Sequence, residues 1–377
     1  MGYKEAITFG ELHKAAMQCA RGIRWKESVQ DYLRNILTRT LTLCRDLERR
    51  RYQIQPYVRF LIHCPKTREI VSTRLRDRVV QRAMCNNGLY ADLVRGFIYD
   101  NCACLVGKGV HFAQKRLAAH MHRYYRRHGA TGWVLKMDIR KFFPSIPHTV
   151  AKSTVAKRVR DPDFVRMVAD IVDSFGDSRP PEVVAADQFG KRGIALGSQI
   201  SQLVALAVLD DLDHIIKERL RMRYYVRYMD DLVILHPDKN VLRAVMLTAQ
   251  AHLAEIGLQL NPKSCIYPVA QGVLFLKFRY LLTPTGKVVK RVTHEAIGKE
   301  RRKLRALQRL YAAGEMTGKQ VNEHFTTWVA HMNHANSRGM VQQMRQYGRR
   351  LFNSGGTNGN AVQNEGTGPT GKAENAP

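Results

Sequence analysis

The stretch RYMDDLVIL, residues 227–235, sets two adjacent aspartates inside an apolar, strand-like run. Neighbouring side chains of a regular strand point to opposite faces, so one of two ionised carboxylates in mid-strand would face the core. A turn at Asp230 and Asp231 avoids this cost, and the flanking apolar residues then form the two strands of a hairpin. A third acid, Asp138, ends another apolar run in GWVLKMDIRKFF. We therefore expect the three acids to converge at one edge of a sheet.

Strand and helix patterns alternate through the middle of the chain, which indicates an α+β fold with a sheet layered by helices. The spacing of apolar residues predicts helices over 33–50, 74–94, 200–219 and 244–257, and strands over 57–71, 132–138, 224–236 and 273–289. The part from 287 to 350 is expected to be mostly helical and carries a net charge of about +10 by its Lys, Arg, Asp and Glu content. The Gly- and Asn-rich end of the chain is expected to be disordered.

Charge restricts the class of partner. The chain has 61 Lys and Arg against 32 Asp and Glu, a formal net charge of +29. Such an excess favours a polyanion, usually nucleic acid. No run is long and apolar enough for a membrane span, and the N-terminus lacks a signal-peptide pattern, so we expect a soluble, cytoplasmic protein with no membrane partner. The seven cysteines form no CxxC pair, which argues against zinc sites and disulfides.

Three carboxylates at one point repel each other unless cations neutralise them. Two Mg²⁺ ions roughly 3.5–4 Å apart, bridged by carboxylates and substrate phosphates, are a known arrangement for phosphoryl transfer. One ion would activate a primer 3′-hydroxyl and the other would stabilise the pyrophosphate leaving group. The alternative is a solvated Asp-Asp turn without a metal. The matching acid at Asp138 and the Tyr228-Met229 lead-in favour the metal site.

These motifs resemble the palm of a reverse transcriptase: YMDD lies downstream of a strand that ends in Asp, and KMDIRKFFPSI is similar to the first palm motif. The resemblance covers roughly residues 30 to 345. It implies a right-hand polymerase with two Mg²⁺ ions, or Mn²⁺ in their place, held by Asp138, Asp230 and Asp231, with Ile139 as a further metal-binding position. Phe143 would act as a steric gate against a ribose 2′-hydroxyl. The alternative for Phe143 is an ordinary core aromatic.

The segment GIALGSQISQL resembles the motif between the two Asp segments. Gly197 would let the backbone approach the template base and the incoming nucleotide, and Gln202 belongs to the same substrate-binding set. Retroviral and group II intron enzymes resemble one another in a Gln-Gly pair followed by Ser-Pro, whereas this chain has Leu196 before the Gly and Ser201-Gln202 later. That form is similar to diversity-generating retroelement enzymes, which copy RNA with errors at adenines. Loss of a polar Gln there makes reduced selectivity physically reasonable.

Basic residues supply the remaining candidate site positions. Residues 56–81 resemble the fingers hairpin of bacterial enzymes of this class, with Lys66 and Arg68 on its turn and Arg78 after it, placed to bind a triphosphate. Lys263 in LQLNPKSCIY is the candidate general acid for pyrophosphate. Lys66, Arg68 and Lys263 each have a solvated surface charge as their alternative. The segment FLKFRYLL resembles the primer grip, with Lys277 where a Gly is usual.

The resemblance implies five segments: a basic helical region (1–50), fingers (51–132), a palm with an antiparallel sheet backed by helices (133–286, helical over 150–190), a helical basic thumb (287–352) and a disordered tail (353–377). Template RNA, a DNA or RNA primer and deoxynucleoside triphosphates are the expected partners, and a small accessory protein is compatible with them. Three functions are compared: diversity-generating retroelement copying in a bacterial host, antiphage or retron-like defence, and RNA binding on an inactive polymerase fold. The intact acids argue against the third.

Overall fold

The computed structural model describes residues 2–62 and 68–353 and forms two compact units, Met1–Pro268 and Val269–Pro377. Strands 273–282 therefore group with the helices that follow them. The finer division into five segments stays a prediction. Among the described residues, the helices are too short or too polar to span a lipid bilayer.

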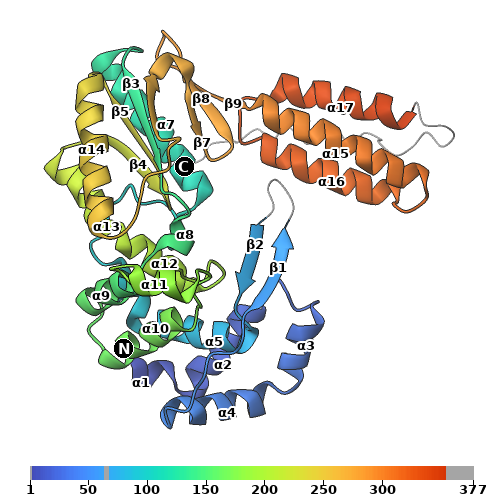
Figure 1. Ribbon diagram of the computed structural model, residues 1–377. Coiled ribbons are helices and arrows are strands. Elements are labelled where there is room, and N and C mark those ends of the chain that lie inside the picture. The colour runs from blue at the N-terminus through green and yellow to red at the C-terminus, as the bar shows by residue number, and fades with distance from the viewer. Residues whose placement is uncertain (1, 63–67, 354–377) are drawn as a thin grey trace, which may run out of the picture. The chain divides into compact units, whose positions relative to one another are not determined.

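The first unit contains both helices and strands (Figure 1). In chain order its elements are α1 (Tyr3–Ala6), α2 (Phe9–Ala20), α3 (Glu27–Arg34), α4 (Ile36–Glu48), β1 (Val58–Ile62), β2 (Arg68–Ser72), α5 (Leu75–Met84), the π-helical turn η1 (Cys85–Leu89), α6 (Tyr90–Val94), α7 (Val110–His128), β3 (Trp133–Asp138), α8 (Phe142–Ser145), α9 (His148–Arg158), α10 (Pro162–Asp173), α11 (Pro181–Ala186), α12 (Gln199–Val208), α13 (Asp210–His214), the π-helical turn η2 (Ile215–Arg219), β4 (Tyr224–Tyr228), β5 (Asp231–His236), α14 (Lys239–Glu255) and β6 (Cys265–Pro268).

A four-stranded antiparallel sheet of order β4-β5-β3-β6 belongs to this unit. In β3 the side chains of Leu135 and Met137 are buried in the main core, while Lys136 and Asp138 on the other face are only partly buried. This alternation follows from the two-residue period of a strand. Helix α14 packs along β3, β5 and β6, and α7 packs against β4 (Figure 1). The predicted hairpin and the predicted strand ending at Asp138 are confirmed. The turn differs by one residue from the prediction, because it consists of Met229 and Asp230, and Asp231 is the first residue of β5.

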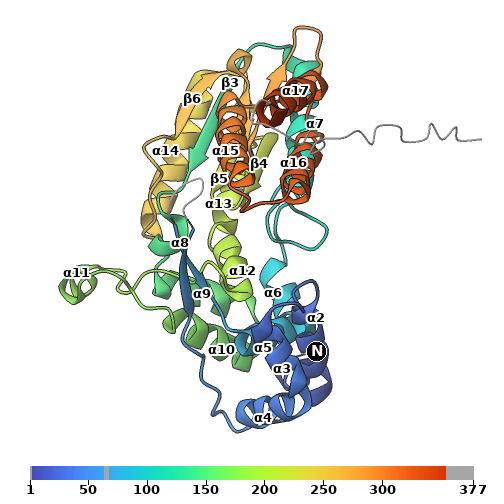
Figure 2. The same ribbon diagram turned by 90° about the vertical axis from the view of Figure 1, so that its right-hand side faces the viewer.

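The N-terminal helices pack against one another, with α2 packed on α4 and α5 (Figure 2). Strands β1 and β2 pair with each other as expected. Three predicted helices are broken, however. The helix expected over 33–50 is interrupted at Asn35, between α3 and α4. The helix expected over 74–94 is interrupted at Gly88, whose φ of 127° is a conformation that L side chains rarely adopt. The helix expected over 200–219 is interrupted at Leu209, because α12 ends at Val208 and α13 begins at Asp210.

The second unit begins with the single helical turn η3 (Val269–Gln271), followed by β7 (Val273–Phe275), β8 (Phe278–Leu282), β9 (Val288–Val292), α15 (His294–Ala312), α16 (Gly318–Met332) and α17 (Arg338–Asn353). The strands form a sheet of order β7-β8-β9. The expectation that residues 287–350 are mostly helical is confirmed. The strand expected to end at residue 289 continues to Val292, because Val288–Val292 pairs with β8. Val329, Met332 and Val341 join α16 and α17 in a small core.

Lys277, which stands where the segment resembling a primer grip would usually have Gly, lies in the turn between β7 and β8. Leu276 and Lys277 have φ of 46° and 74°, so both adopt the left-handed conformation that suits Gly. Lys277 is exposed. Lys277 therefore adopts a backbone conformation that suits Gly, and its side chain adds a charge on the surface.

Candidate active site

Asp138 and Asp231 face each other across the first sheet. Strands β3 and β5 are antiparallel, with Asp138 opposite Asp231, Met137 opposite Leu232 and Lys136 opposite Val233. Directly opposed residues lie on the same face with Cβ atoms about 4.5–5.5 Å apart. The register thus brings two of the three predicted acids together, although they are remote in the sequence.

Met229 and Asp230 form the two-residue turn between β4 and β5, because Tyr228 pairs with Asp231. Met229 has φ 55°, and the left-handed conformation is one that two-residue hairpin loops usually fill with Gly, Asn or Asp. For another residue type it costs about 1–2 kcal/mol, so neighbouring contacts must hold the turn. Asp230 follows this strained residue and lies close enough for its charge to act on Asp231.

Asp231 sits in an environment that disfavours its ionised form. Its pKa is raised to about 6, mainly by burial, which outweighs the opposing charge of Lys136, and in smaller part by the negative charges of Asp138 and Asp230. The Lys136 Nζ lies 3.5 Å from Oδ2 of Asp231. The other carboxylate oxygen, Oδ1, is buried and has no hydrogen-bond partner among the described residues. An added positive charge at this oxygen would therefore stabilise the folded protein.

Asn261 holds Asp138 in place. Its side-chain Nδ2 donates to Oδ2 of Asp138 at 2.7 Å, and its backbone N–H donates to the Asp138 carbonyl at 2.7 Å. The Asp138 N–H donates to the Ser264 hydroxyl at 3.2 Å. The Ser264 hydroxyl in turn donates to the Asp138 carbonyl at 3.4 Å. The loop before β6 thus holds Asp138 through one hydrogen bond to its carboxylate and three to its backbone.

Arg227 supports the turn from the opposite, buried face of the sheet. Its guanidinium is fully buried and forms a two-pronged ion pair with Asp213 of α13, with Nη2 to Oδ2 at 2.6 Å and Nε to Oδ1 at 2.8 Å. The Nη1 donates to the carbonyl of Met229 at 3.0 Å, and Tyr225 donates its hydroxyl to Asp213 at 2.5 Å. This network ties the strained turn to a helix in the core.

The acids do not close into a metal-binding cluster of three. Within the ranges that the structure describes, no group of three His, Cys, Asp or Glu side chains is arranged to hold a metal ion. The expected convergence is confirmed for the backbone, which places Asp138 opposite Asp231 and Asp230 in the adjoining turn. In this structure the Asp138 carboxylate accepts from Asn261, and Asp231 lies beside Lys136. Ile139 follows at the end of β3, and its side chain is buried in the core. Metal binding by these positions stays a prediction.

Phe143 belongs to α8, shortly after β3, and Gly197 pairs with the end of β2. Phe143 is partly buried against the core, in edge-to-face contact with Phe142 at 5.5 Å between ring centroids. A Cβ added to Gly197 would lie 2.3 Å from the Val71 carbonyl oxygen, which accepts the Gly197 N–H at 3.0 Å. The glycine is therefore required for close approach to the backbone of β2, a reason that the sequence did not suggest. Its predicted contact with substrate stays a prediction.

The remaining predicted site residues are spread over the first unit. Gln202 on α12 donates its Nε2 to the Leu196 carbonyl at 3.1 Å. Arg78 on α5 donates Nη2 to the Ser72 hydroxyl and Nε to the Thr73 carbonyl, at 2.7 and 3.0 Å. Lys263 is exposed, two residues beyond Asn261. Arg68 begins β2, whereas Lys66 lies outside the described residues.

Comparison with known proteins identifies the family. The family model for "Reverse transcriptase (RNA-dependent DNA polymerase)" matches residues 63–280, more than half of the 377 residues. The chain belongs to the reverse transcriptase family. The α+β right-hand polymerase fold expected from the sequence is confirmed by this match and by the mixed helices and antiparallel sheets.

Other comparisons add little beyond the family. No curated protein matches this reverse transcriptase. Among solved structures, telomerase from Candida albicans in complex with a TWJ fragment of telomeric RNA is similar, with 12% sequence identity and a TM-score of 0.46. The similarity covers 82% of this chain and 60% of the telomerase chain, so this reverse transcriptase spans less than two thirds of its length.

Sequence reasoning missed the residues that hold the acids of this reverse transcriptase in place. Lys136 precedes Asp138 by two residues, and the period of a strand would have placed both on one face. Arg227 is a charged residue inside an otherwise apolar strand, which signals a buried partner. Asn261 gives no such signal, since it reaches Asp138 only through the register of β3 and the loop before β6.

Proposed function

We propose that the chain is an RNA-directed DNA polymerase that adds deoxynucleotides to a primer on an RNA template. The observation that carries the proposal is the cross-strand pair of Asp138 and Asp231, with Asp230 in the adjoining turn. Family membership supports the reaction class. The net charge of +29 supports a nucleic-acid substrate held mainly through its phosphates, so affinity should fall as salt rises.

The acids at the sheet edge fit Mg²⁺, with Mn²⁺ as an alternative, because carboxylate oxygens are the ligands that such cations take. Asp138, Asp230 and Asp231 would hold two ions, and the buried, unpartnered Oδ1 of Asp231 is an atom that a cation would satisfy. When bound, the ions would lower the pKa of the primer 3′-hydroxyl and stabilise the departing pyrophosphate.

Side chains of the protein position the acids and supply a proton in this proposal. Asn261 orients the carboxylate of Asp138, and Lys136 offsets part of the negative charge of Asp231. Arg227 fixes the turn that carries Asp230. Lys263 is exposed and free to approach a leaving group as a proton donor.

The test is primer extension by the full chain on an RNA template. A 5′-labelled DNA primer, the four deoxynucleoside triphosphates and Mg²⁺ are supplied, and the products are sized and sequenced. We expect template-directed extension on RNA that EDTA abolishes. Binding of the primer–template is measured in the same preparation. Bound primer–template without extension in either Mg²⁺ or Mn²⁺ would contradict the proposal.

We further propose that the enzyme copies with low fidelity, as in a diversity-generating retroelement. Leu196 supports this proposal, because its side chain is 37% exposed at the loop before α12 and supplies no hydrogen bond there. Gln202 binds the backbone of the same loop and so limits its movement. A template repeat with an adenine-substituted near-copy in the neighbouring DNA would support this role over defence, and a small accessory protein would be a further partner.

Leu196→Gln should reduce misincorporation opposite template adenine by about 3–10-fold, because one added hydrogen bond near the templating pair is worth about 0.5–1.5 kcal/mol. Sequencing of extension products on an adenine-containing RNA measures the error rate at each base. Leu196→Met keeps the position apolar and is the matched control, with an expected wild-type error rate. An unchanged error rate in the Gln variant would remove Leu196 from the fidelity argument.

A further inference from the structure

A charged cluster lies in the segment between α10 and α12. This segment forms the short helix α11, which projects from the body of the first unit, and then returns toward α12 (Figure 2). No residue of α11, which the structure describes in full, is buried. Arg179 pairs with Asp177 and with Asp187, each at 2.6 Å, and Arg192 pairs with Asp187 at 2.5 Å. These ion pairs therefore join the two ends of the projecting segment.

The guanidinium of Arg192 holds several groups of the protein at once. Its side chain is only 17% exposed. Nε and Nη2 donate to the two carboxylate oxygens of Asp187 at 2.5 and 3.1 Å. Nη1 donates to two backbone carbonyls, that of Ser145 at 3.1 Å and that of Gly257. Four of the five guanidinium N–H groups thus have acceptors within the chain. Arg192 is therefore committed to protein structure and is poorly placed to bind a substrate phosphate.

The two carbonyls belong to two segments that carry residues of the candidate site. Ser145 ends α8, the helix that contains Phe143, the predicted steric gate. Gly257 lies at the start of the loop that leads to Asn261, whose side chain orients the carboxylate of Asp138. One guanidinium group thus ties the segment of the predicted gate to the loop that holds a predicted metal ligand.

The backbone around Arg192 strengthens the link to the predicted gate. Arg192 pairs with Pro147 as an isolated antiparallel bridge. Two residues later, Ile194 donates its N–H to the carbonyl of Phe143 at 3.1 Å. The backbone of Phe143 is therefore bonded directly to the segment that Arg192 holds in place.

The contact with Gly257 is closely packed. Gly257 has φ 71°, a left-handed conformation that favours Gly, and a Cβ added there would lie 2.8 Å from the ring of Phe189. The Arg192 guanidinium lies 5.3 Å from the centroid of the same ring, within the range of a cation–π contact. The loop and the returning segment therefore fit together without spare room, so a shift of one displaces the other.

We propose that Arg192 is a positioning residue that sets the separation between the Phe143 segment and the loop that orients Asp138, and thereby the selection against a ribose 2′-hydroxyl. The inference rests on the proposed polymerase function and adds to it a residue outside the acidic edge. A pocket that rejects an added hydroxyl by shape alone reaches only about 10²-fold selection. A small displacement of the gate removes much of that selection.

The test compares insertion of one nucleotide, from dGTP or from GTP, by the full chain on an RNA template with a DNA primer in Mg²⁺. Single-turnover kinetics give kpol/Kd for each nucleotide, and their ratio is the sugar preference. Arg192→Ala removes the whole clamp and should lower this preference by about tenfold or more. Arg192→Lys keeps the charge beside Asp187 but not the planar fork, so it should fold as the wild type and lower the preference by about threefold or more.

Arg179→Ala is the matched control. Arg179 pairs with the same Asp187, but its backbone acceptor is the Gly190 carbonyl at 2.8 Å, within its own segment. Its loss should leave the sugar preference within about twofold of the wild type. Urea unfolding of all variants shows how far each is destabilised, and anisotropy with a labelled primer–template shows whether each still binds.

The outcomes separate this inference from the proposed function. Absence of extension by the wild type would refute the polymerase proposal itself. Extension by the wild type with an unchanged sugar preference in both Arg192 variants would overturn the role of Arg192 alone. An equal loss of preference in Arg192→Ala and Arg179→Ala would overturn it too, since it would trace the effect to the stability of the cluster. A loss confined to the two Arg192 variants, with normal primer–template binding, establishes the positioning role.

Discussion

Asp231→Asn should abolish primer extension while it makes the folded protein more stable. Metal-assisted phosphoryl transfer draws several kcal/mol of transition-state stabilisation from the ions, so loss of a metal ligand should reduce the rate by about 10³-fold or more. Template binding should change little, because it depends on the basic surface. Extension by single-turnover kinetics and RNA binding by anisotropy measure the two effects separately.

The stability effect follows from the raised pKa of Asp231. A carboxyl with a folded-state pKa of about 6, against about 3.9 when unfolded, is disfavoured in the folded protein once it ionises. The wild type should therefore lose ~2–3 kcal/mol of unfolding free energy as pH rises from about 4 to above 6. Asp231→Asn should not show this loss. Urea unfolding at pH 4 and pH 7 measures the difference.

Mg²⁺ provides the check on the assignment of the site. Saturating Mg²⁺ at pH 7 should raise the unfolding midpoint of the wild type and leave that of Asp231→Asn unchanged, because a ligand stabilises only the state that binds it. Asp211→Asn removes an exposed aspartate outside the site and should behave as the wild type in both respects. Equal stabilisation of wild type and Asp231→Asn by Mg²⁺ would contradict the assignment.

The sequence allowed prediction of those parts of the site that depend on local pattern. The apolar runs before and after the hairpin turn predict β4 and β5, and the apolar run that ends at Asp138 predicts β3. This prediction works because period-two patterns specify which face of a strand is buried. The pairing of Asp138 with Asp231 then follows from the hairpin and one cross-strand register. The sequence pattern alone could not show which side chain contacts each carboxylate, such as Asn261 against Asp138.

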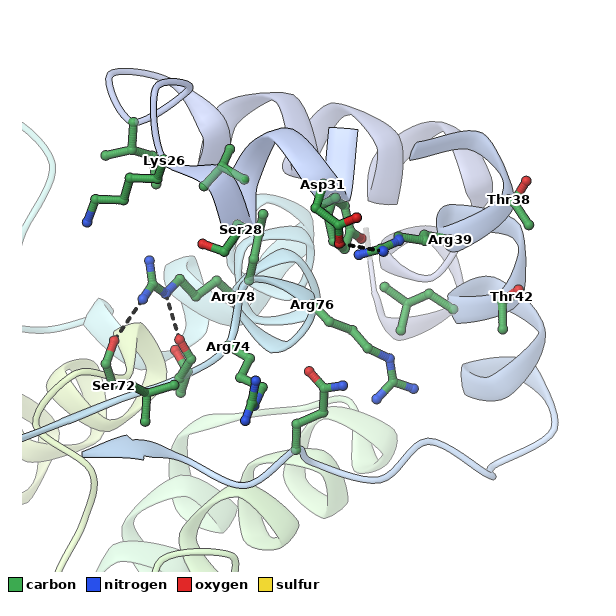
Figure 3. A pocket seen from close by; sticks show the side chains of 18 of the residues that line it. Lys26, Ser28, Asp31, Thr38, Arg39, Thr42, Ser72, Arg74, Arg76 and Arg78 are labelled. Carbon is green, nitrogen blue, oxygen red and sulfur yellow. Dashed lines mark hydrogen bonds and ion pairs between the residues drawn. The ribbon is translucent and has the colours of Figure 1, made fainter. Parts of the chain in front are cut away.

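Breaks and cavities were beyond prediction for a different reason. The break at Leu209 between α12 and α13 is not marked by a Gly or Pro in the sequence. After this break, α13 carries Asp213 to Arg227. A basic cavity is lined by residues of α3, α4, β1 and α5 (Figure 3). Its net charge depends on which cations remain without an acidic partner after folding. Both are properties of tertiary packing, which overrides local propensity.

Arg227→Leu should lower the unfolding free energy by about 3–5 kcal/mol, because it leaves the carboxylate of Asp213 buried with only the Tyr225 hydroxyl as a side-chain partner. Urea or thermal unfolding measures this loss. The variant would also lose the Nη1 donor to the Met229 carbonyl, so its activity alone could not separate misfolding from a misplaced turn.

The double variant Arg227→Leu/Asp213→Leu makes that separation, because it removes both buried charges and should recover most of the stability. The turn would still lack its hydrogen bond to Met229, so extension should remain down by about 10–100-fold, as expected when a reacting group is displaced slightly. Arg158→Leu/Asp210→Leu removes a second ion pair anchored on α13 that has no bond to the turn, and should retain extension. Wild-type extension by a stable Arg227→Leu/Asp213→Leu protein would show that Arg227 serves folding alone. Reduced extension in that protein, at normal stability, would identify Arg227 as the residue that positions Asp230 from beneath the sheet.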